Sequence, residues 1–540
     1  MRVKTSKNSP KRSVQIVESY RNEKNQPRQR IVRHLGTAFT DKELERLRDF
    51  AQHEIAKLET EKTPSLFKPQ QLAEAAIAAR SRADKDEVLQ VNLKKLCEES
   101  RFVTGIHEAF GMVYDEIGFE SLFGSRNQAS AKNLRNITMA RIANPESKRA
   151  SVKDLSQDFG LNLSLDGVYR MMDRVDEKLI EKAQKLAYES AKSLLNDKIS
   201  VIFYDCTTLY FESFSEDELK KNGYSKDMKF NQPQVVLGLM ATSEGLTIGY
   251  EVFLGNQYEG HTLKTMIPRL KQKYNIQRVI FTADSAMLSR NNLEYLETSE
   301  LEYIVAARLK NLDSYWTDKV TGSREPLRSF DYGQGRRLIV TYNDKLARKN
   351  SHDRDKAIDK LQKKLEKSSK PESLISNYGY KRFLKIAGNA EIEIDQVKYA
   401  QAARFDGLHG VITNVRDLSD NDVIEHYHGL WQIENCFRVA KHDLQIRPVY
   451  HWTPRRIRAH ILICFLALTC LNQLSYRLKL RFEQMSAGRM INALNHIQVS
   501  ILYHTGNNRR YVLPSKFNED ARKIYKTLGL TVDTTPYRLS

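Results

Sequence analysis

The order of strands and helices between residues 201 and 307 is the feature that most limits the fold of this chain. Residues 201–211 (Val-Ile-Phe-Tyr-Asp-Cys-Thr-Thr-Leu-Tyr-Phe) are rich in β-branched and aromatic residues and predict a strand. Two more strands are expected at 235–240 and 246–253, and the three should run antiparallel. The elements expected next are a helix at 261–273, a strand at 278–283, a helix from Ser289 and a strand at 303–307. This mixed order predicts one α/β sheet domain.

Helical segments flank this region. From Thr40 to about Leu195 the chain is rich in Ala, Leu, Lys and Glu at helical spacing, and long helices return from Asp420 to about His496. Within the first segment, a helix from Ser151, a turn at Gly160 and a helix at 164–175 outline a helix-turn-helix. An αα-hairpin with only a packing role fits the same pattern.

Residues 308–406 interrupt the plan with short strands, a charged helical stretch at 353–367 and the loop 333–337, and we interpret them as a large insertion. The Gly-x-Gly of the loop lacks the strand context of a dinucleotide site and the lysine and serine of a P-loop. The loop therefore does not indicate a nucleotide site.

The charge balance indicates a polyanionic partner. Lys and Arg number 86 against 67 Asp and Glu, which gives a net charge of +19 and a pI near 9.4. The chain shows no lipidation motif or signal peptide, and its longest apolar run, 461–471, is shorter than the roughly 18 residues that span a bilayer. We expect a buried helix there, no membrane association, and nucleic acid as the partner.

The five cysteines form no Cys-x-x-Cys pair, and this usage predicts a reducing cytoplasm. His426 and His428 are two residues apart on an expected helix, where they point to different faces, so zinc binding is not indicated.

The first 36 residues carry ten Lys or Arg against two acids. Val14, Ile16 and the pair Ile31-Val32 flank a polar turn at 22–26, which predicts a β-hairpin ending at Gly36. Arg28 and Arg30 on this arm are candidate DNA contacts. A solvated basic terminus without a specific role is the alternative.

The segment 422–444 predicts a helix with an unusual stripe. Residues recur along it at steps of 4 and 3, in the order Val423, Tyr427, Leu430, Glu434, Phe437, Lys441 and Leu444. A buried stripe should not hold charges unless they are paired or bound to metal. Glu434 and Lys441 lie about two turns apart, too far for a direct pair, so Glu434 requires another partner.

Two further carboxylates occupy similar positions. Asp205 lies within the strand 201–211, with Thr207 on the same face, and Asp284 closes the apolar run 279–283. Asp284 taken alone is better explained as a helix N-cap. Three carboxylates brought together repel one another unless a hard cation lies between them, and Mg²⁺, with Mn²⁺ as a possible substitute, prefers oxygen ligands. Such ions support in-line attack on a phosphodiester.

These residues together resemble a known family. The motifs are Tyr204-Asp-Cys-Thr-Thr, Phe253-Leu-Gly-Asn256 with Thr262-Leu263, Thr282-Ala-Asp284, and Tyr427-x2-Leu-x3-Glu434-x6-Lys441. They resemble the bacterial insertion-sequence DDE transposases whose signature is Y-x2-R-x3-E-x6-K. The opening, with Val17-Glu-Ser-Tyr-Arg, Pro27-Arg-Gln-Arg and Leu35-Gly36, is similar to one subgroup of that family. The resemblance extends from the N-terminal hairpin to the helix near His460.

The resemblance implies an α/β fold with a ribonuclease H-like catalytic domain that contains a β-rich insertion, a helical DNA-binding region before it and C-terminal helices after it. The expected divisions are a basic hairpin arm at 1–36, the helical region at 37–195, the catalytic domain at 196–307 and 407–500, the insertion at 308–406 and a C-terminal tail at 501–540. It also implies Mg²⁺-dependent end cleavage and strand transfer by Asp205, Asp284 and Glu434. The partners would be double-stranded DNA, both transposon ends and target, and a second copy of the chain in a synaptic complex, located in the bacterial cytoplasm and at the nucleoid when DNA is bound.

The same resemblance assigns DNA contacts. Tyr427 and Lys441 would contact phosphates at the transposon end, although a core aromatic and a solvated lysine are the alternatives. Leu430 occupies the signature's Arg position, and Arg438, one turn after Glu434, is our hypothetical substitute. Trp316, in the insertion, is a candidate for stacking on a displaced base. The basic cluster Arg455, Arg456, Arg458 and His460 either follows the DNA backbone or is a polar helix entry.

Two other functions compete with transposition. A stand-alone ribonuclease H-like nuclease would cut without joining, but the long insertion and the basic N-terminal region favour more than hydrolysis. A non-catalytic DNA-binding regulator is the other, and the presence of all three carboxylates disfavours it. A tyrosine recombinase would require a His-x-x-Arg motif, which the sequence lacks.

Overall fold

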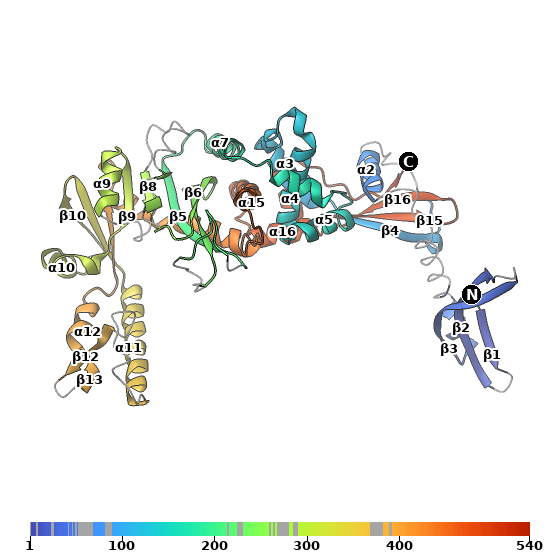
Figure 1. The fold of residues 1–540 in the computed structure, drawn as a ribbon, viewed down its shortest axis with the longest axis horizontal. Coiled ribbons are helices and arrows are strands. Elements are labelled where there is room, and N and C mark those ends of the chain that lie inside the picture. The colour runs from blue at the N-terminus through green and yellow to red at the C-terminus, as the bar shows by residue number, and fades with distance from the viewer. Residues whose placement is uncertain are drawn as a thin grey trace. The chain divides into compact units, whose positions relative to one another are not determined.

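The computed structural model describes residues 2–6, 9–22, 26–41, 43–45, 47–48, 51, 69–80, 89–212, 215–223, 231–258, 261–262, 265–266, 280–283, 290–367, 382–387 and 391–539 (Figure 1). The chain divides into two compact units. Unit 1 comprises Met1–Ala109, Lys148–Gly167 and Gly488–Ser540, and unit 2 comprises Phe110–Ser147 and Val168–Ala487. Each unit is described separately below.

Unit 2 is built on an eight-stranded sheet with the order β10-β11-β14-β9-β8-β5-β6-β7. The expected antiparallel trio is confirmed as β5 (Val201–Tyr210), β6 (Gln234–Thr242) and β7 (Thr247–Leu254). The two later strands are confirmed as β8 (Ile280–Ala283), parallel to β5, and β9 (Glu302–Ala306), parallel to β8. Nearly every residue of β5 and β6 is buried, which explains their almost continuous apolar runs.

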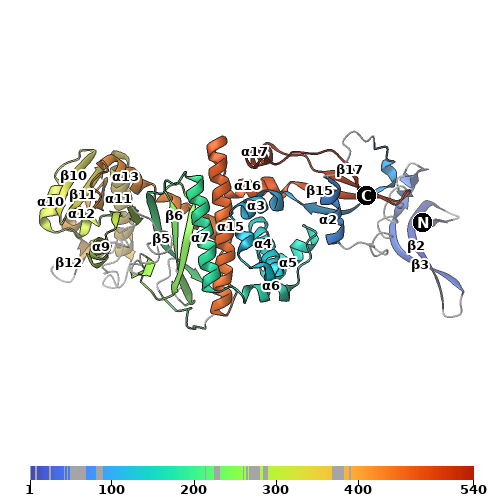
Figure 2. The ribbon, with the colours of Figure 1, turned by 90° about the horizontal axis from the view of Figure 1, so that it is seen from above.

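Two long helices pack on this sheet. Helix α7 (Glu177–Leu194) and helix α15 (Pro454–Arg481) contact each other and β7, and Figure 2 shows them side by side next to the sheet. Among the described residues, α15 alone is long and apolar enough to cross a membrane, with a mean hydropathy of 1.6 in its most apolar window. Because 89% of that window is buried inside the protein, α15 is a core helix, as expected for 461–471.

The insertion differs from the expected β-rich unit. Strands β10 (Leu327–Gly333) and β11 (Arg336–Tyr342) extend the main sheet, because β11 pairs with β14 (Leu408–Thr413). The remaining elements are α10 (Ser314–Thr321), α11 (Asp344–Lys367), the small sheet β12 (Leu384–Ala387) with β13 (Glu391–Ile394), and α12 (Gln396–Ala403). Residues 333–335 form the β10–β11 turn, where all three residues have positive φ. This turn geometry accounts for the Gly-x-Gly motif.

Unit 1 contains the predicted N-terminal hairpin. Strands β2 (Ser9–Arg21) and β3 (Pro27–Ala38) pair antiparallel, from Arg21 opposite Pro27 to Arg12 opposite Ala38. A third strand that we did not predict, β1 (Arg2–Ser6), pairs with β2. Val14, Ala38, Leu44 and Ala51 form a small core for this arm.

A four-stranded sheet in unit 1 corrects the expected C-terminal tail. Its order is β17-β16-β15-β4, formed by β4 (Leu96–Val103), β15 (Gln498–His504), β16 (Arg509–Pro514) and β17 (Tyr537–Leu539). Helix α17 (Glu519–Leu528) lies between β16 and β17 in the chain, and α2 (Pro69–Arg80) contributes to the same core. Only Phe102 of β4 is buried, so the strand has no two-residue apolar pattern that the sequence could reveal.

The other helices of the N-terminal region are α3 (Gly105–Glu116), α4 (Gln128–Ala143), α5 (Lys148–Gln157) and α6 (Leu165–Met172). Helices α5 and α6, with Gly160 between them at φ +66°, match the expected helix-turn-helix outline. DNA binding by this outline stays a prediction.

Candidate active site

Strand β5 presents Asp205 at a less buried point of an otherwise buried strand. The Asp205 carboxylate accepts a hydrogen bond of 2.7 Å from the backbone N–H of Cys206. Two threonine hydroxyls, on Thr207 of β5 and Thr282 of β8, are buried without a hydrogen-bond partner among the described residues. Because buried hydroxyls are normally satisfied, this end of the sheet has polar capacity that the described protein groups do not use.

Strand β8 lies directly beside β5 in parallel register, with Val201 opposite Ile280 and Phe203 opposite Thr282. Asp284, the expected second carboxylate, lies outside the described residues, as does most of the helix expected at 261–273. Among the described residues, no group of three or more His, Cys, Asp or Glu side chains is placed to hold a metal ion.

The helix expected at 422–444 is divided into three parts. Helix α13 (Asp420–His428) is followed by a turn at Gly429 and Leu430, then by α14 (Trp431–Arg438) and by the π-helix η8 (Val439–Asp443). The turn and the wider π-helical turn both change the helical phase, so a regular spacing of 4 and 3 no longer follows one face.

The single apolar face predicted for seven residues is therefore wrong. Val423, Leu430, Phe437 and Leu444 are buried, Tyr427 and Lys441 are half-buried, and Glu434 is exposed. The helix α14 packs against β5 and β6, and Ile433 and Cys436 on α14 are buried there with Phe437. Among the residues that the structure describes, no side chain hydrogen-bonds or ion-pairs with the Glu434 carboxylate. Because Glu434 is exposed, its charge does not require a partner within the protein. Its oxygens are available to a ligand.

Gly429 allows the close approach of this helical segment to the sheet. A Cβ atom at residue 429 would lie 2.6 Å from Cζ of Phe203 in β5 and 3.0 Å from the carbonyl oxygen of His426. We expect Gly429→Ala to lower the free energy of unfolding by about 1–3 kcal/mol, because Phe203 is fully buried and its ring has little room to move. Denaturant unfolding measures the effect.

Gly124→Ala is the matched control, because a Cβ there meets no atom within 4 Å. If Gly429→Ala unfolded at the same midpoint denaturant concentration as the wild type, the close approach at Gly429 would not matter for stability.

The residues expected to contact phosphates occupy different environments. The ring of Tyr427 packs on His409 with centroids 4.9 Å apart, and the ammonium of Lys441 lies 5.9 Å from the Phe437 ring centroid. Arg438 is exposed at the end of α14, and its guanidinium donates to the side chain of Asn435.

The other expected DNA contacts lie elsewhere. Trp316 on α10 is half-buried against Tyr332 and Phe330 of β10, with ring centroids 4.9 and 6.4 Å away. In unit 1, Arg28 is exposed, and Arg30 forms a 2.6 Å ion pair with Glu18 across the hairpin.

The basic cluster at the start of α15 is engaged within the protein. Arg456 forms a 2.6 Å ion pair with Asp173, and Arg458 lies 3.2 Å from Glu177. His460 is buried and hydrogen-bonds through Nε2 to the Ile446 carbonyl at 3.0 Å. These contacts favour the interpretation of the cluster as a polar helix entry.

Sequence reasoning missed an aromatic loop beside the end of β5. The backbone N–H of Val449 donates to the Tyr210 carbonyl at 3.1 Å, which fixes residues 449–452 to the strand that carries Asp205. In this loop, Tyr450 is 64% exposed and Trp452 is 70% exposed. We name these two side chains the aromatic loop pair. The signal is absent from the sequence because the exposure of an aromatic residue depends on its tertiary surroundings.

Comparisons with known proteins give the family. The family described as "Transposase DDE domain" matches residues 196–470, and the "IS1634 family transposase, N-terminal domain" matches residues 1–65. A search of curated proteins gave no match.

Among solved structures, the piggyBac transposase synaptic complex with hairpin DNA aligns at 11% identity and a TM-score of 0.39, over 73% of this chain and 78% of that chain. The Mos1 transposase paired-end complex with the left transposon end aligns at 15% identity and a TM-score of 0.15, over 29% and 53% of the two chains. The family assignment rests on the first comparison, whose main match covers half of the chain. The chain belongs to the DDE transposases of bacterial insertion sequences, enzymes that cleave DNA and transfer its strands.

Proposed function

We propose that this transposase binds the ends of its own insertion sequence and uses Asp205, Asp284 and Glu434 to hold the divalent cations for cleavage and strand transfer. The observation that carries the proposal is the packing of α14 against β5, which presents Asp205; α14 presents an exposed Glu434 that no described side chain pairs with. Two carboxylates from segments more than 200 residues apart in sequence thus belong to neighbouring elements.

The strand order supports a ribonuclease H-like catalytic domain. The five strands β7-β6-β5-β8-β9 combine an antiparallel trio with two parallel strands on its other side. The candidate carboxylates belong to the central strand of this group, to the segment after β8, and to a helix packed on the sheet. We propose the boundaries 1–36, 37–195, 196–307 with 407–500, and 308–406 for the domains. Residues 501–540 are not a tail, because they contribute strands to the sheet of unit 1.

The register of β5 and β8 supports the role of Asp284. Strand β8 pairs with β5, the strand of Asp205, and ends at Ala283, the residue before Asp284 in the sequence. Neighbouring strands are about 4.8 Å apart. Carboxylates on adjacent strands at that spacing would repel one another, and a cation between them would relieve the repulsion.

The residues fit a hard divalent cation, since the candidate ligands are all carboxylate oxygens, and the sheet holds the Thr207 and Thr282 hydroxyls, which have no partner among the described residues. Mg²⁺, with Mn²⁺ as a possible substitute, would activate a water or a 3′-hydroxyl and stabilise the leaving oxygen. Asp205 and Glu434 would hold the ions from strand and helix. Lys441 and Arg438, which follow Glu434 in the chain, would neutralise phosphates of the bound end, and Tyr427 would position them.

DNA binding elsewhere would rest on the basic surface of the chain. We propose that the exposed Arg28 and the paired Arg30 contact transposon-end phosphates from the hairpin arm. Trp316 remains a proposed stacking residue, although its ring already packs on β10. We further propose that two copies of the chain hold the two ends in the synaptic complex, and that the enzyme acts in the cytoplasm.

The aromatic loop pair is proposed to stack on unpaired bases at the cut end. Trp452→Ala should weaken binding to an end with unpaired terminal bases by about tenfold, because stacking on an aromatic ring contributes roughly 1–3 kcal/mol per base. Fluorescence anisotropy measures this binding. Phe482→Ala is the control, because Phe482 is 39% exposed at the C-terminal end of α15, another part of unit 2. Equal affinities of wild type and Trp452→Ala would refute the stacking role.

The experiment that tests the proposed function uses the purified full chain and a DNA fragment that carries the element's terminal repeats. With Mg²⁺, the wild type should release the ends and join them to a target, and chelation should abolish both steps. Asp205→Ala, Asp284→Ala and Glu434→Ala should each remove both products. Metal-dependent cleavage in all three variants would overturn the assignment, and cleavage without any joined product would favour a stand-alone nuclease.

A further inference from the structure

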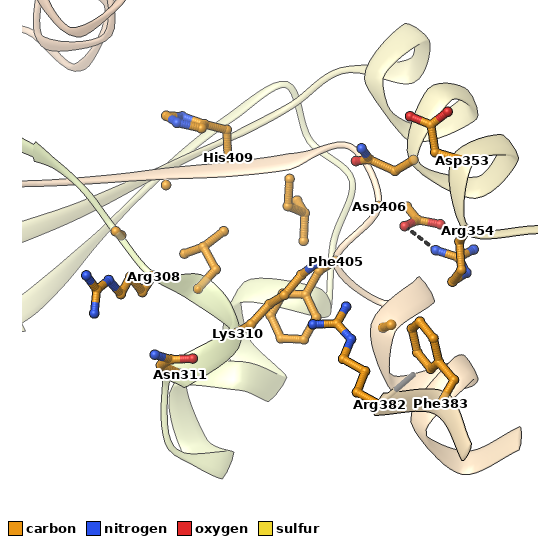
Figure 3. A pocket seen from close by; sticks show the side chains of 16 residues that line it. Arg308, Lys310, Asn311, Asp353, Arg354, Arg382, Phe383, Phe405, Asp406 and His409 are labelled. Atoms are coloured by element: carbon orange, nitrogen blue, oxygen red, sulfur yellow. Dashed lines mark hydrogen bonds and ion pairs between the residues drawn. The ribbon is translucent and has the colours of Figure 1, made fainter. Parts of the chain in front are cut away.

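A cavity in unit 2 is lined by none of the residues that we propose for catalysis. It has a volume of about 780 Å³ and lies where the short helix η5 (Leu309–Asn311), α11, the start of β12 and the segment 402–410 meet (Figure 3). Its size is within the range of about 300–1,000 Å³ that is typical of small-ligand sites.

The lining of this cavity has an excess of positive charge. Four cationic side chains line it, Arg308, Lys310, Arg354 and Arg382, against two acids, Asp353 and Asp406. Arg354 and Asp406 neutralise each other in a largely buried ion pair with a 2.5 Å contact. Among the described residues, neither Lys310 nor Arg382 has an ion-pair partner. Two cations therefore face this space without a carboxylate bound to either.

The surroundings make this arrangement unfavourable for the protein alone. Burial lowers the pKa of Lys310, and the nearby charge of Arg382 lowers it further, against an opposing effect from Asp406. A partly desolvated ammonium beside a second cation costs stability. Such a cost is typical of a binding site, where an anionic ligand supplies the missing charge.

One wall of the cavity is aromatic. Phe383 is buried and Phe405 is half-buried, and the Arg382 guanidinium carbon lies 5.0 Å from the centroid of the Phe383 ring. Another wall is formed by His409 of β14, whose ring packs on Tyr427 of α13. The cavity thus combines cations for a phosphate with apolar rings for an attached sugar or base, and it adjoins the helix that precedes Glu434.

We propose that this cavity binds a phosphate ester, with the phosphate between Lys310 and Arg382 and the attached group against Phe405. The phosphate can come from a single strand of DNA or from a free nucleotide, and the experiment separates these sources. Binding is measured without cleavage, so failure here would leave the proposed catalytic function intact.

The test uses the full chain and four proteins: wild type, Lys310→Gln, Arg382→Gln and the control Lys360→Gln. Lys360 is an exposed lysine of α11 that does not line the cavity. Calorimetric titration with deoxyadenosine monophosphate and with inorganic pyrophosphate probes the free ligand, and anisotropy with a labelled oligothymidylate of about ten nucleotides probes the strand. Each cavity variant should bind the relevant ligand with about tenfold lower affinity than Lys360→Gln does.

The outcomes are distinct. Loss of nucleotide and pyrophosphate binding in the two cavity variants assigns a free nucleotide. If the two cavity variants lose binding only to the oligonucleotide, the ligand of the cavity is a DNA strand. Equal affinities of all four proteins for every probe would overturn the proposal. Thermal unfolding excludes misfolding, because Lys310→Gln removes a repulsive charge and should melt at or above the wild-type temperature.

Discussion

Glu434→Gln is expected to lower the rate of DNA end cleavage by on the order of a thousandfold or more, while the protein folds normally and still binds DNA. The amide keeps the size and shape of the side chain but loses the negative charge that would hold the cation. Because Glu434 is exposed and no described side chain pairs with it, its replacement breaks no described contact of the folded protein. Single-turnover cleavage at saturating protein, with a parallel binding assay, separates the two effects.

Glu425→Gln is the matched control, since Glu425 is an exposed carboxylate on the preceding helix α13. Its cleavage rate should remain within about twofold of the wild type, as expected for a surface substitution. A Glu434→Gln enzyme that cleaves at the rate of this control would remove Glu434 from the catalytic group.

Arg336→Gln is expected to lower the free energy of unfolding by about 3 kcal/mol. Arg336 of β11 donates two hydrogen bonds to Glu297 of α9 (Arg290–Thr298), at 2.7 and 2.8 Å, and the Tyr303 hydroxyl of β9 donates a third at 2.7 Å. The Arg336 side chain is 9% exposed and that of Glu297 25%, so the substitution leaves a carboxylate in a largely buried place. Chemical denaturation measures the loss.

Arg404→Gln provides the comparison, because the Arg404–Asp318 pair has a similar 2.6 Å contact but is exposed at both ends. That substitution should cost less than about 1 kcal/mol. Similar losses in the two variants would show that the burial of the Arg336 pair is unimportant.

The same pair predicts a pH dependence. Hydrogen bonding from Arg336 holds the pKa of Glu297 below its ordinary value of 4.5. The contribution to stability is therefore complete above pH 4.5 and is lost as the pH falls through the lowered pKa. The stability difference between wild type and Arg336→Gln should be constant near neutral pH and shrink on acidification. A difference that grows towards low pH would contradict this sign.

The central strands were predictable because burial on both faces requires a continuous run of apolar residues in the sequence. Strands β5 and β6 are almost wholly apolar, and the N-terminal hairpin has a polar turn between two segments that contain β-branched residues. Asp205 was noticeable for the same reason, as a charge within an apolar run. The candidate site could be inferred to that extent from residue types alone.

The segment 422–444 was harder to predict, because helical periodicity is informative only while the helix continues without interruption. The turn at Gly429 and the π-helix after Arg438 alter the phase, and Glu434 lies exposed rather than on a buried stripe. The family spacing drew attention to Glu434, whereas the burial argument for it was wrong. The aromatic loop pair left no local pattern, since its exposure results from how residues 449–452 are fixed to β5.

The pairing of β4 with β15 has a consequence for how the chain is made. The two strands are separated by about 400 residues in the chain. At synthesis rates of 5–20 residues per second, β4 waits roughly 20–80 s for its partner. A chain that ends prematurely, at any point before residue 498, never completes this sheet. Synthesis must therefore pass residue 498 before the sheet of the unit that carries the basic N-terminal arm can form.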